Sequence, residues 1–136
     1  MSELQFRRLT PVVIVAAIEP VLPFWAKLGA KVAIEVPHGN ALGFVSIELG
    51  AAEVMYQTVA SVEADGGGAV DRTAYRAPPQ QAYLFIEVGS LSEVEARLAG
   101  EPIYLPRRAT FYGSRETGYV DPAGNLVVFA EFPAAA

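Results

Sequence analysis

The chain has 136 residues, of which 52% are hydrophobic and 18% charged, and its formal net charge is −5. This length and apolar content predict one compact domain spanning residues 1–136, with a sizeable buried core, and exclude a disordered chain. The acidic balance excludes a nucleic-acid interface, which needs clustered lysine and arginine. Because the chain has no cysteine, disulfide scaffolds and thiolate metal sites are excluded as well.

The N-terminal segment does not have the pattern of a targeting sequence. Two arginines precede a short apolar run, but Pro11 and Pro20 interrupt it, so we expect no signal peptide. Apolar runs elsewhere fall short of the roughly 20 residues that a membrane-spanning helix needs. We therefore expect a cytoplasmic protein that contacts neither membrane nor nucleic acid.

The first part of the chain, residues 5–60, is predicted to form a β-α-β-β-β module. The β-branched run LTPVVIVA predicts a strand over 9–16. A short helix is predicted over 18–29, because its two prolines fall in the first turn and Gly29 supplies a stop. Three further strands are predicted over 31–36, 43–49 and 52–59.

Residues 61–80 are interpreted as a linker, because they contain three consecutive glycines and a Pro-Pro pair. The pattern then restarts over 81–133, with a strand over 82–89. A helix follows over 90–100, in which Ser90 and Glu93 have capping-box spacing. The remaining prediction is strands over 101–105, 117–120 and 126–132, with a loop over 106–114 and a tight turn over 121–125.

The two modules have similar internal spacing. Pro11 and Tyr83 are 72 positions apart, and the helix-ending glycines at 29 and 100 are 71 apart. Met55 and Val128, in the closing strands, are 73 apart. These nearly constant offsets indicate a duplicated unit. The alternative is two unrelated α+β halves.

Four segments resemble a known family and together cover most of the chain: TPVVIVAAIEPVLPFWAKLGAKV, ELGAAEVMYQT, YLFIEVGSLSEVEARL and YGSRETGYVDPAGNLVVFAEF. The last is the most specific, with G-x-R-E followed by D-P-x-G-N before an apolar strand. The sequence resembles the vicinal oxygen chelate superfamily, which includes glyoxalase I, extradiol dioxygenases, fosfomycin resistance enzymes and bleomycin resistance proteins. The resemblance implies an α+β fold of paired βαβββ modules, curved sheets around a cleft, and a homodimer.

The resemblance also implies where a metal would be held in this family. Its ligand positions correspond here to Pro11, Met55, Tyr83 and Val128. Proline and valine offer no donor atom, a thioether suits hard divalent ions poorly, and one phenol cannot hold an ion. We therefore expect no metal, no cofactor and no catalytic residue of the family type. The branch most resembled is the metal-free bleomycin resistance type, which binds and sequesters a small molecule.

Strand alternation predicts a cleft lining without reference to the family. In each strand one face mixes apolar or aromatic side chains with polar ones, which suits a bulky amphipathic ligand. The predicted lining residues are Phe44, Ser46, Glu48, Met55, Gln57, Tyr83 and Phe85. The alternative is that these residues fill a closed core or face water.

Two further regions supply candidate ligand contacts. Trp25 stands in PFWAKLG, where packing of the helix on the sheet is the competing and favoured interpretation. Phe111 and Tyr112 lie in the predicted loop and could stack on a planar ligand. We expect Arg115 and Glu116 to form a structural ion pair and His38, the one histidine, to lie in a solvated turn.

The sequence thus predicts a metal-independent protein that sequesters a bulky, aromatic antibiotic or toxic metabolite as a homodimer. Two alternatives remain open. One is a lyase or isomerase in which Glu48, Glu53 or Tyr83 acts as acid or base, with a carboxylate pKa raised by an apolar cleft. The other is a partner-binding module without a small ligand, which a collapsed core in place of the cleft would favour.

Overall fold

The computed structural model describes residues 3–67, 71 and 80–134. In chain order its elements are β1 (Val12–Val15), the 3-10 helix η1 (Glu19–Val21), α1 (Leu22–Lys27), β2 (Lys31–His38), β3 (Ala41–Leu49), β4 (Ala52–Thr58), α2 (Val59–Gly66), β5 (Tyr83–Glu87), α3 (Leu91–Arg97), β6 (Ile103–Ala109), β7 (Arg115–Val120) and β8 (Leu126–Glu131). Within these described residues, no helix has the length and apolar content needed to cross a membrane.

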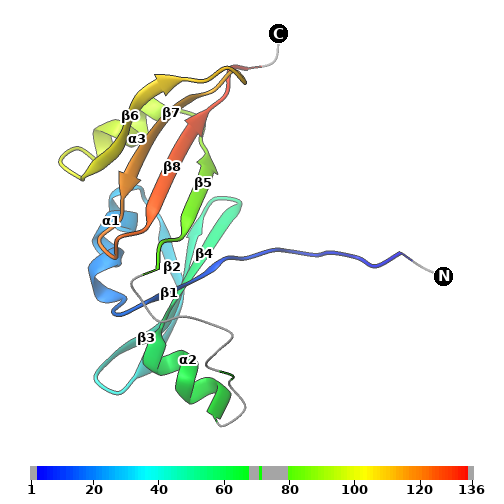
Figure 1. Cartoon of the computed structure of the whole chain (residues 1–136), viewed down its shortest axis with the longest axis vertical. Coiled ribbons are helices and arrows are strands. Elements are labelled where there is room, and N and C mark those ends of the chain that lie inside the picture. Colours follow the sequence, from blue (N-terminus) through cyan, green and yellow to red (C-terminus); the bar gives the residue numbers. More distant parts are fainter. Residues whose placement is uncertain (1–2, 68–70, 72–79, 135–136) are drawn as a thin grey trace.

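Each module forms one four-stranded sheet, in the orders β1-β4-β3-β2 and β5-β8-β7-β6. In both sheets the first strand pairs in parallel with the last, and the other neighbours pair antiparallel. The sheets lie one beyond the other along the length of the molecule, and residues 3–10 extend away from them as an arm (Figure 1). The predicted α+β fold with two βαβββ modules is confirmed.

Strand register shows that the predicted alignment of the modules is inconsistent. Met55 pairs with Val12 in the first sheet, and Val128 pairs with Phe85 in the second, so if Met55 and Val128 are counterparts, Val12 and Phe85 are counterparts too. Pro11 shares a strand face with Val13 of the core, whereas Tyr83 lies on the face opposite to Leu84, which packs against the core. The predicted equivalence of Pro11 with Tyr83 was therefore wrong, because sequence spacing does not fix which face a residue occupies.

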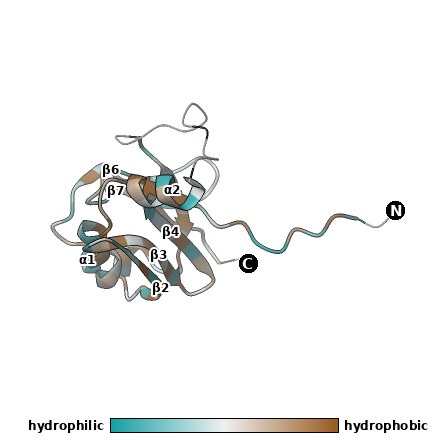
Figure 2. Ribbon diagram, turned by 90° about the horizontal axis from the view of Figure 1, so that it is seen from below, coloured by the Kyte–Doolittle hydropathy of each residue, from teal (hydrophilic) through white to brown (hydrophobic). Residues whose placement is uncertain are grey.

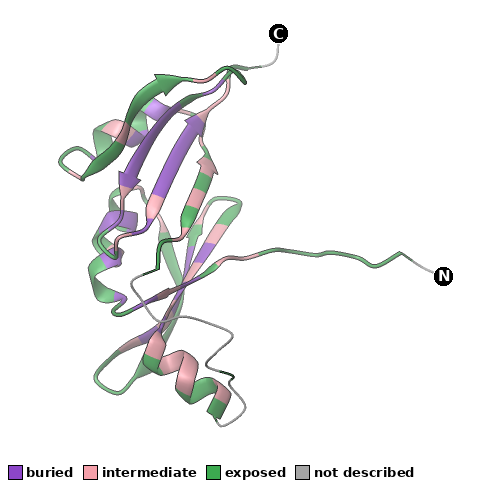
Figure 3. Ribbon diagram, viewed as in Figure 1, coloured by how far each residue is buried: buried purple, intermediate pink, exposed green. Residues whose placement is uncertain are grey.

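One hydrophobic core serves both modules. It joins Val45, Ile47 and Tyr56 of the first sheet to Tyr119 and Phe129 of the second. Helices α1 and α3 contribute further buried side chains, among them Phe24, Trp25, Leu91 and Val94. The central strands β7 and β8 are largely buried, whereas the edge strands β2 and β6 are mostly exposed (Figure 3).

A buried hydrogen-bonded chain links the modules. Trp25 donates from Nε1 to the Tyr56 hydroxyl at 2.9 Å, and Tyr56 donates to Oδ2 of Asp121 at 3.0 Å. Burial, together with the Asp121 charge, raises the pKa of Tyr56, so its hydroxyl stays a donor. Asp121 also accepts backbone N–H bonds from Ala123 and Asn125 through Oδ1. The predicted turn over 121–125 is thus confirmed, and it is also a contact between modules.

Two local predictions need correction. The segment interpreted as a linker from residue 61 begins inside helix α2, whose N-cap Thr58 accepts a hydrogen bond from the Ser61 N–H at 3.2 Å. Seen from below, α2 projects beside β4 as a short mixed helix with apolar and polar positions (Figure 2). The predicted loop over 106–114 is partly strand, because β6 continues to Ala109. The predicted cap at Ser90 is confirmed by its 3.2 Å bond from the Glu93 N–H.

Candidate functional site

Each sheet has one face packed in the core and one face turned away from it, which we call its open face. On the first sheet the alternation is clear, since Val45 and Ile47 are buried in the core. The open face carries Val12, Ile14, Ile34, Val36, Phe44, Ser46, Glu48, Glu53, Met55 and Gln57. The predicted lining residues of this sheet therefore share one face.

The predicted lining residues of the first sheet differ in their exposure to solvent. Glu48 is exposed, while Phe44, Met55 and Gln57 are half-buried. Ser46 is buried, because its hydroxyl donates to Oε2 of Glu53 at 2.5 Å and lies beneath its neighbours. Ser46 thus positions a carboxylate and offers no free hydroxyl to a ligand.

The open face of the second sheet is defined by three cross-strand rows. Phe85 pairs with Val128, which pairs with Gly118. The next row runs from Glu87 through Ala130 and Glu116 to Arg108. Tyr83 lies in the third row, paired with Leu126. The structure therefore brings Tyr83 and Phe85 together on an open face, and both side chains are exposed.

Tyr104 also lies on this face, packed against Gly118. A β-carbon at Gly118 would approach Cε1 of Tyr104 to 2.6 Å, so the ring occupies the space that a side chain would need. The Tyr83 and Tyr104 rings meet edge to face with centroids 6.5 Å apart. Burial raises the pKa of Tyr104, and its contact with Tyr83 raises it further. Val128, the strand neighbour of Gly118 on the same face, is fully buried.

Glu116 is a buried carboxylate at the end of this face, with 1% of its side chain exposed. Its Oε2 accepts hydrogen bonds from the Tyr112 hydroxyl at 2.5 Å and the Ser114 hydroxyl at 3.0 Å, and its Oε1 accepts one from Nη2 of Arg108 at 3.1 Å. Burial raises the pKa of Glu116, but these bonds together outweigh it and hold the pKa below its usual range. Glu116 is therefore an ionised, fully engaged group.

The predicted Arg115–Glu116 ion pair was wrong. Adjacent residues of a strand point to opposite faces, so the partner of Glu116 comes from the neighbouring strand and is Arg108. Tyr112, a predicted ligand contact, donates its hydroxyl hydrogen to Glu116, and its side chain remains partly exposed. Phe111 is fully exposed and contacts the Tyr112 ring at 5.1 Å.

Trp25 is not available to a ligand. Its side chain is 1% exposed, packs edge to face on Phe24 at 5.3 Å and bonds to Tyr56. The competing interpretation, helix packing on the sheet, is the one that its surroundings support. The prediction of Trp25 as a ligand contact was therefore wrong, because its ring is buried in the core.

The positions that would hold a metal in the resembled family do not fit one here. Pro11 precedes β1 on the side of the buried Val13, so the residue of β1 that points to the open face is Val12. Valine has no donor atom, Val128 is buried, and Met55 and Tyr83 supply one thioether and one phenol. In the described part of the chain, no group of three or more histidine and carboxylate side chains is arranged to hold an ion.

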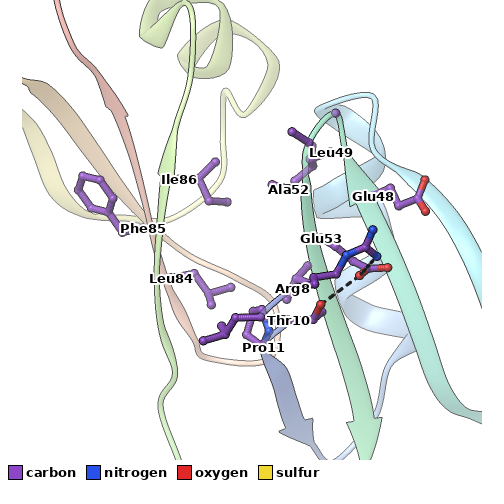
Figure 4. Close-up of a pocket in the computed structure, with 14 residues that line it drawn as sticks. Arg8, Thr10, Pro11, Glu48, Leu49, Ala52, Glu53, Leu84, Phe85 and Ile86 are labelled. Carbon is purple, nitrogen blue, oxygen red and sulfur yellow. Dashed lines mark hydrogen bonds and ion pairs between the residues drawn. The ribbon is translucent and has the colours of Figure 1, made fainter. Parts of the chain in front are cut away.

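A groove of about 320 Å³ lies where the modules meet, between the arm, the β3–β4 turn and β5 (Figure 4). Leu84 and Ile86 point toward the turn, whereas Phe85 points away from it. Among the predicted site residues, Glu48 and Phe85 line this groove. A second hollow of about 690 Å³ lies on the helix side of the same turn. Both hollows share the β3–β4 turn, at a junction between the modules that strand alternation alone does not reveal.

Glu53 dominates the polar side of the groove. It accepts hydrogen bonds from Ser46, from the Thr10 hydroxyl at 3.2 Å and from Nη1 of Arg8 at 3.3 Å. The bond from Ser46 is the main cause of its lowered pKa, with Thr10 and Arg8 adding to the effect. The expectation of a raised carboxylate pKa in the cleft was therefore wrong for Glu53, because its neighbours are donors.

Sequence reasoning missed Arg108, Tyr104, Thr10 and Arg8 as parts of these surfaces. The doublet Arg107–Arg108 carried a usable signal, since in a strand two adjacent arginines must face opposite ways. It was lost when the segment was assigned to a loop. Thr10 and Arg8 reach Glu53 across more than 40 positions, a contact with no local sequence signal.

No protein-family model matches the sequence, and comparison with curated proteins finds no significant match. Solved structures do match over nearly the whole chain. TioX from Micromonospora sp. ML1 superposes with a TM-score of 0.73 at 14% identity, covering 94% of this chain and 100% of its own. A glyoxalase/bleomycin resistance protein/dioxygenase from Nocardioides gives 0.68 at 15% identity, covering 98% and 89%.

A bleomycin-binding protein, solved in complex with bleomycin, gives a TM-score of 0.64 at 14% identity and covers 94% of this chain and 100% of its own. These neighbours have the paired-module architecture derived above from register and core. At such low sequence identities, the similarity to these structures is a similarity of backbone fold. The chain therefore has the fold of the glyoxalase/bleomycin resistance protein/dioxygenase group, the fold of the vicinal oxygen chelate superfamily.

Proposed function

We propose that this chain is a metal-independent binding protein that sequesters a bulky, aromatic antibiotic or toxic metabolite. The observation that carries the proposal is the open face of the second sheet. Tyr83, Phe85 and Tyr104 expose ring surface there, and Arg108 and Tyr112 supply polar groups beside them. Apolar walls with a few fixed polar groups are the usual lining of a site for an organic ligand.

Sequestration rather than turnover is favoured by the state of the polar groups. The buried and half-buried carboxylates, Glu116 and Glu53, have lowered pKa values and are held by several donors. A general base needs a pKa near the working pH and a free lone pair. Neither carboxylate meets those needs, and the positions for a family metal supply only one thioether and one phenol, which do not make a metal site.

We further propose that the protein acts as a homodimer. The arm exposes Leu4 (78%), Phe6 (89%) and Leu9 (91%), and the open faces expose further apolar side chains on both sheets. Large contiguous apolar surface on a small protein marks an interface. A second copy is the occupant that we propose, because the arm extends away from its own core and so cannot bury these side chains itself (Figure 1).

Calorimetric titration of the full chain with bleomycin, a mitomycin-type quinone and a quinoline-bearing DNA-binding peptide tests the function. We expect one of these to bind at micromolar concentration or below, with the same affinity in excess EDTA. Phe85→Ser should weaken that binding about tenfold, the usual effect of losing one aromatic contact. Glu93→Gln, on the outer surface of α3, is the matched control and should leave the affinity unchanged.

Three results would contradict the proposal. Failure of all three compounds to bind below millimolar concentration in a folded sample would remove the sequestration role. Loss of binding in EDTA would remove metal independence. Turnover of a bound compound would favour the lyase or isomerase alternative.

A further inference from the structure

Arg107 and Arg108 are neighbours in β6 with opposite environments. Arg107 donates to Oε1 of Glu95 in α3 at 2.5 Å and to the Ser92 hydroxyl at 3.4 Å, so it lies on the helix side of the sheet. Arg108 pairs with Glu116 on the open face. The doublet therefore supplies a cation to the candidate site and a matched cation outside it.

Arg108 is fixed by its partner and still accessible. In the described part of the chain, Glu116 is the one hydrogen-bond partner of this guanidinium, through Nη2, and the Arg108 side chain is 51% exposed. Glu116 in turn is held by Tyr112 and Ser114. A guanidinium has five N–H donors in one plane, so most of them remain free to meet an incoming acceptor.

Tyrosine side chains lie beside this guanidinium. Tyr112 bonds to the same Glu116 carboxylate as Arg108. The Tyr104 ring lies over Gly118, two residues along β7 from Glu116, and meets the Tyr83 ring edge to face. The side chains of Tyr83, Tyr104 and Tyr112 are each partly exposed. A planar ring lying on these tyrosines would have its edge next to the free guanidinium donors.

The other charged groups on this face do not offset the positive charge of Arg108. Glu116 is buried beneath Arg108, so a ligand meets the cation first. Glu87 is at the far end of the same cross-strand row, three strands away, or roughly 14 Å at the usual spacing. Charges in water are largely screened beyond about 8 Å at physiological salt, which limits the effect of Glu87 and of the net charge of −5.

We propose that Arg108 makes this open face selective for planar aromatic anions, in which a carboxylate or comparable oxyanion at the ring edge pairs with the guanidinium while the ring lies on the tyrosines. This inference rests on the proposed binding function and specifies its ligand class.

The test compares two probes with the same ring and opposite charge, 2-naphthoate and 2-naphthylmethylammonium. Both are titrated calorimetrically into the full chain at pH 7. We expect naphthoate to bind at least tenfold more tightly. Arg108→Gln combined with Glu116→Gln, which removes both charges and leaves no buried carboxylate unpaired, should abolish the preference. Arg108→Lys keeps the charge but loses the planar fork, and should retain only part of the preference.

Arg107→Gln is the control, and its preference should equal that of the parent chain. Equal binding of the two probes, or tighter binding of the ammonium, would overturn the selectivity while leaving the binding function intact. Loss of the preference in Arg107→Gln would also overturn it. If neither naphthalene binds while an antibiotic of the earlier panel does, the anion selectivity fails alone; if nothing binds, both proposals fail.

Discussion

Tyr56 and Asp121 lie 65 positions apart in the chain and share a buried hydrogen bond of 3.0 Å. Tyr56 belongs to β4 of the first module, and Asp121 opens the turn before β8 of the second. The same tyrosine oxygen accepts the bond from Trp25. One hydroxyl therefore links α1, β4 and the turn before β8 across the boundary between the modules.

Replacing Tyr56 by phenylalanine should lower the free energy of unfolding by about 1–3 kcal/mol, because Trp25 and Asp121 each lose a buried partner. Urea denaturation followed by circular dichroism measures this. Tyr119→Phe is the control, since Tyr119 is buried in the same core without a hydrogen bond within the described residues. Equal costs for the two substitutions would show that the Tyr56 hydroxyl contributes nothing specific.

Glu116 should make stability depend on pH in the acid range. Since its pKa is lower in the folded state, its contribution is present above the unfolded value of about 4.3 and is lost as the pH falls through the folded value. Urea denaturation at pH 7 and pH 3 should show Glu116→Gln clearly destabilised at pH 7 and closer to the parent at pH 3. Exposed Glu48, replaced by Gln, should show little change at either pH. A Glu116→Gln deficit that is the same at both pH values would contradict this.

Gly118 should not tolerate a side chain. Its β-carbon would lie 2.6 Å from Cε1 of Tyr104 and 2.9 Å from Cβ of Leu105, so Gly118→Ala must displace the strand or the ring. We expect a loss of about 1–3 kcal/mol in unfolding free energy, as for other overpacked sites. Tyr104→Ala in the same background should recover part of it. Gly89→Ala, where the added carbon meets nothing within 4 Å, is the matched control.

The arm should determine the oligomeric state. Light scattering after gel filtration should give twice the chain mass for the parent protein. The combined change of Leu4, Phe6 and Leu9 to serine should give a monomer, because the interface loses its exposed apolar anchors. Phe111→Ser, which alters a fully exposed ring outside the arm, should leave the dimer unchanged. A parent protein that is monomeric at tens of micromolar would contradict the dimer.

Much of the fold was predictable from local signals. β-branched runs located the strands, the helix cap at Ser90 was visible in the sequence, and the Asp121 turn followed from its residue types. Register was not predictable, because a shift of one residue leaves every local pattern unchanged. That Pro11 and Tyr83 are not equivalent appears only in the pairing and in the burial of the neighbouring residues.

The sequence predicted which site residues share a face of a sheet, but it did not predict which side chains bond to one another. Alternation correctly grouped Phe44, Met55 and Gln57 on one face and Tyr83 with Phe85 on another. It could not show that Ser46 is covered by Glu53, since that depends on how side chains turn across strands. Nor could it show the Arg108–Glu116 pair, because the predicted strand over 101–105 stopped short of Arg108, whereas β6 runs from Ile103 to Ala109.

Pro11 fixes where the first sheet ends. Its carbonyl accepts the N–H of Met55 at 2.9 Å, but a proline has no N–H with which to extend the β1–β4 ladder backward. Residues before it are thereby released from the sheet and leave as the arm. One missing N–H at position 11 therefore frees an N-terminal segment to reach beyond its own fold.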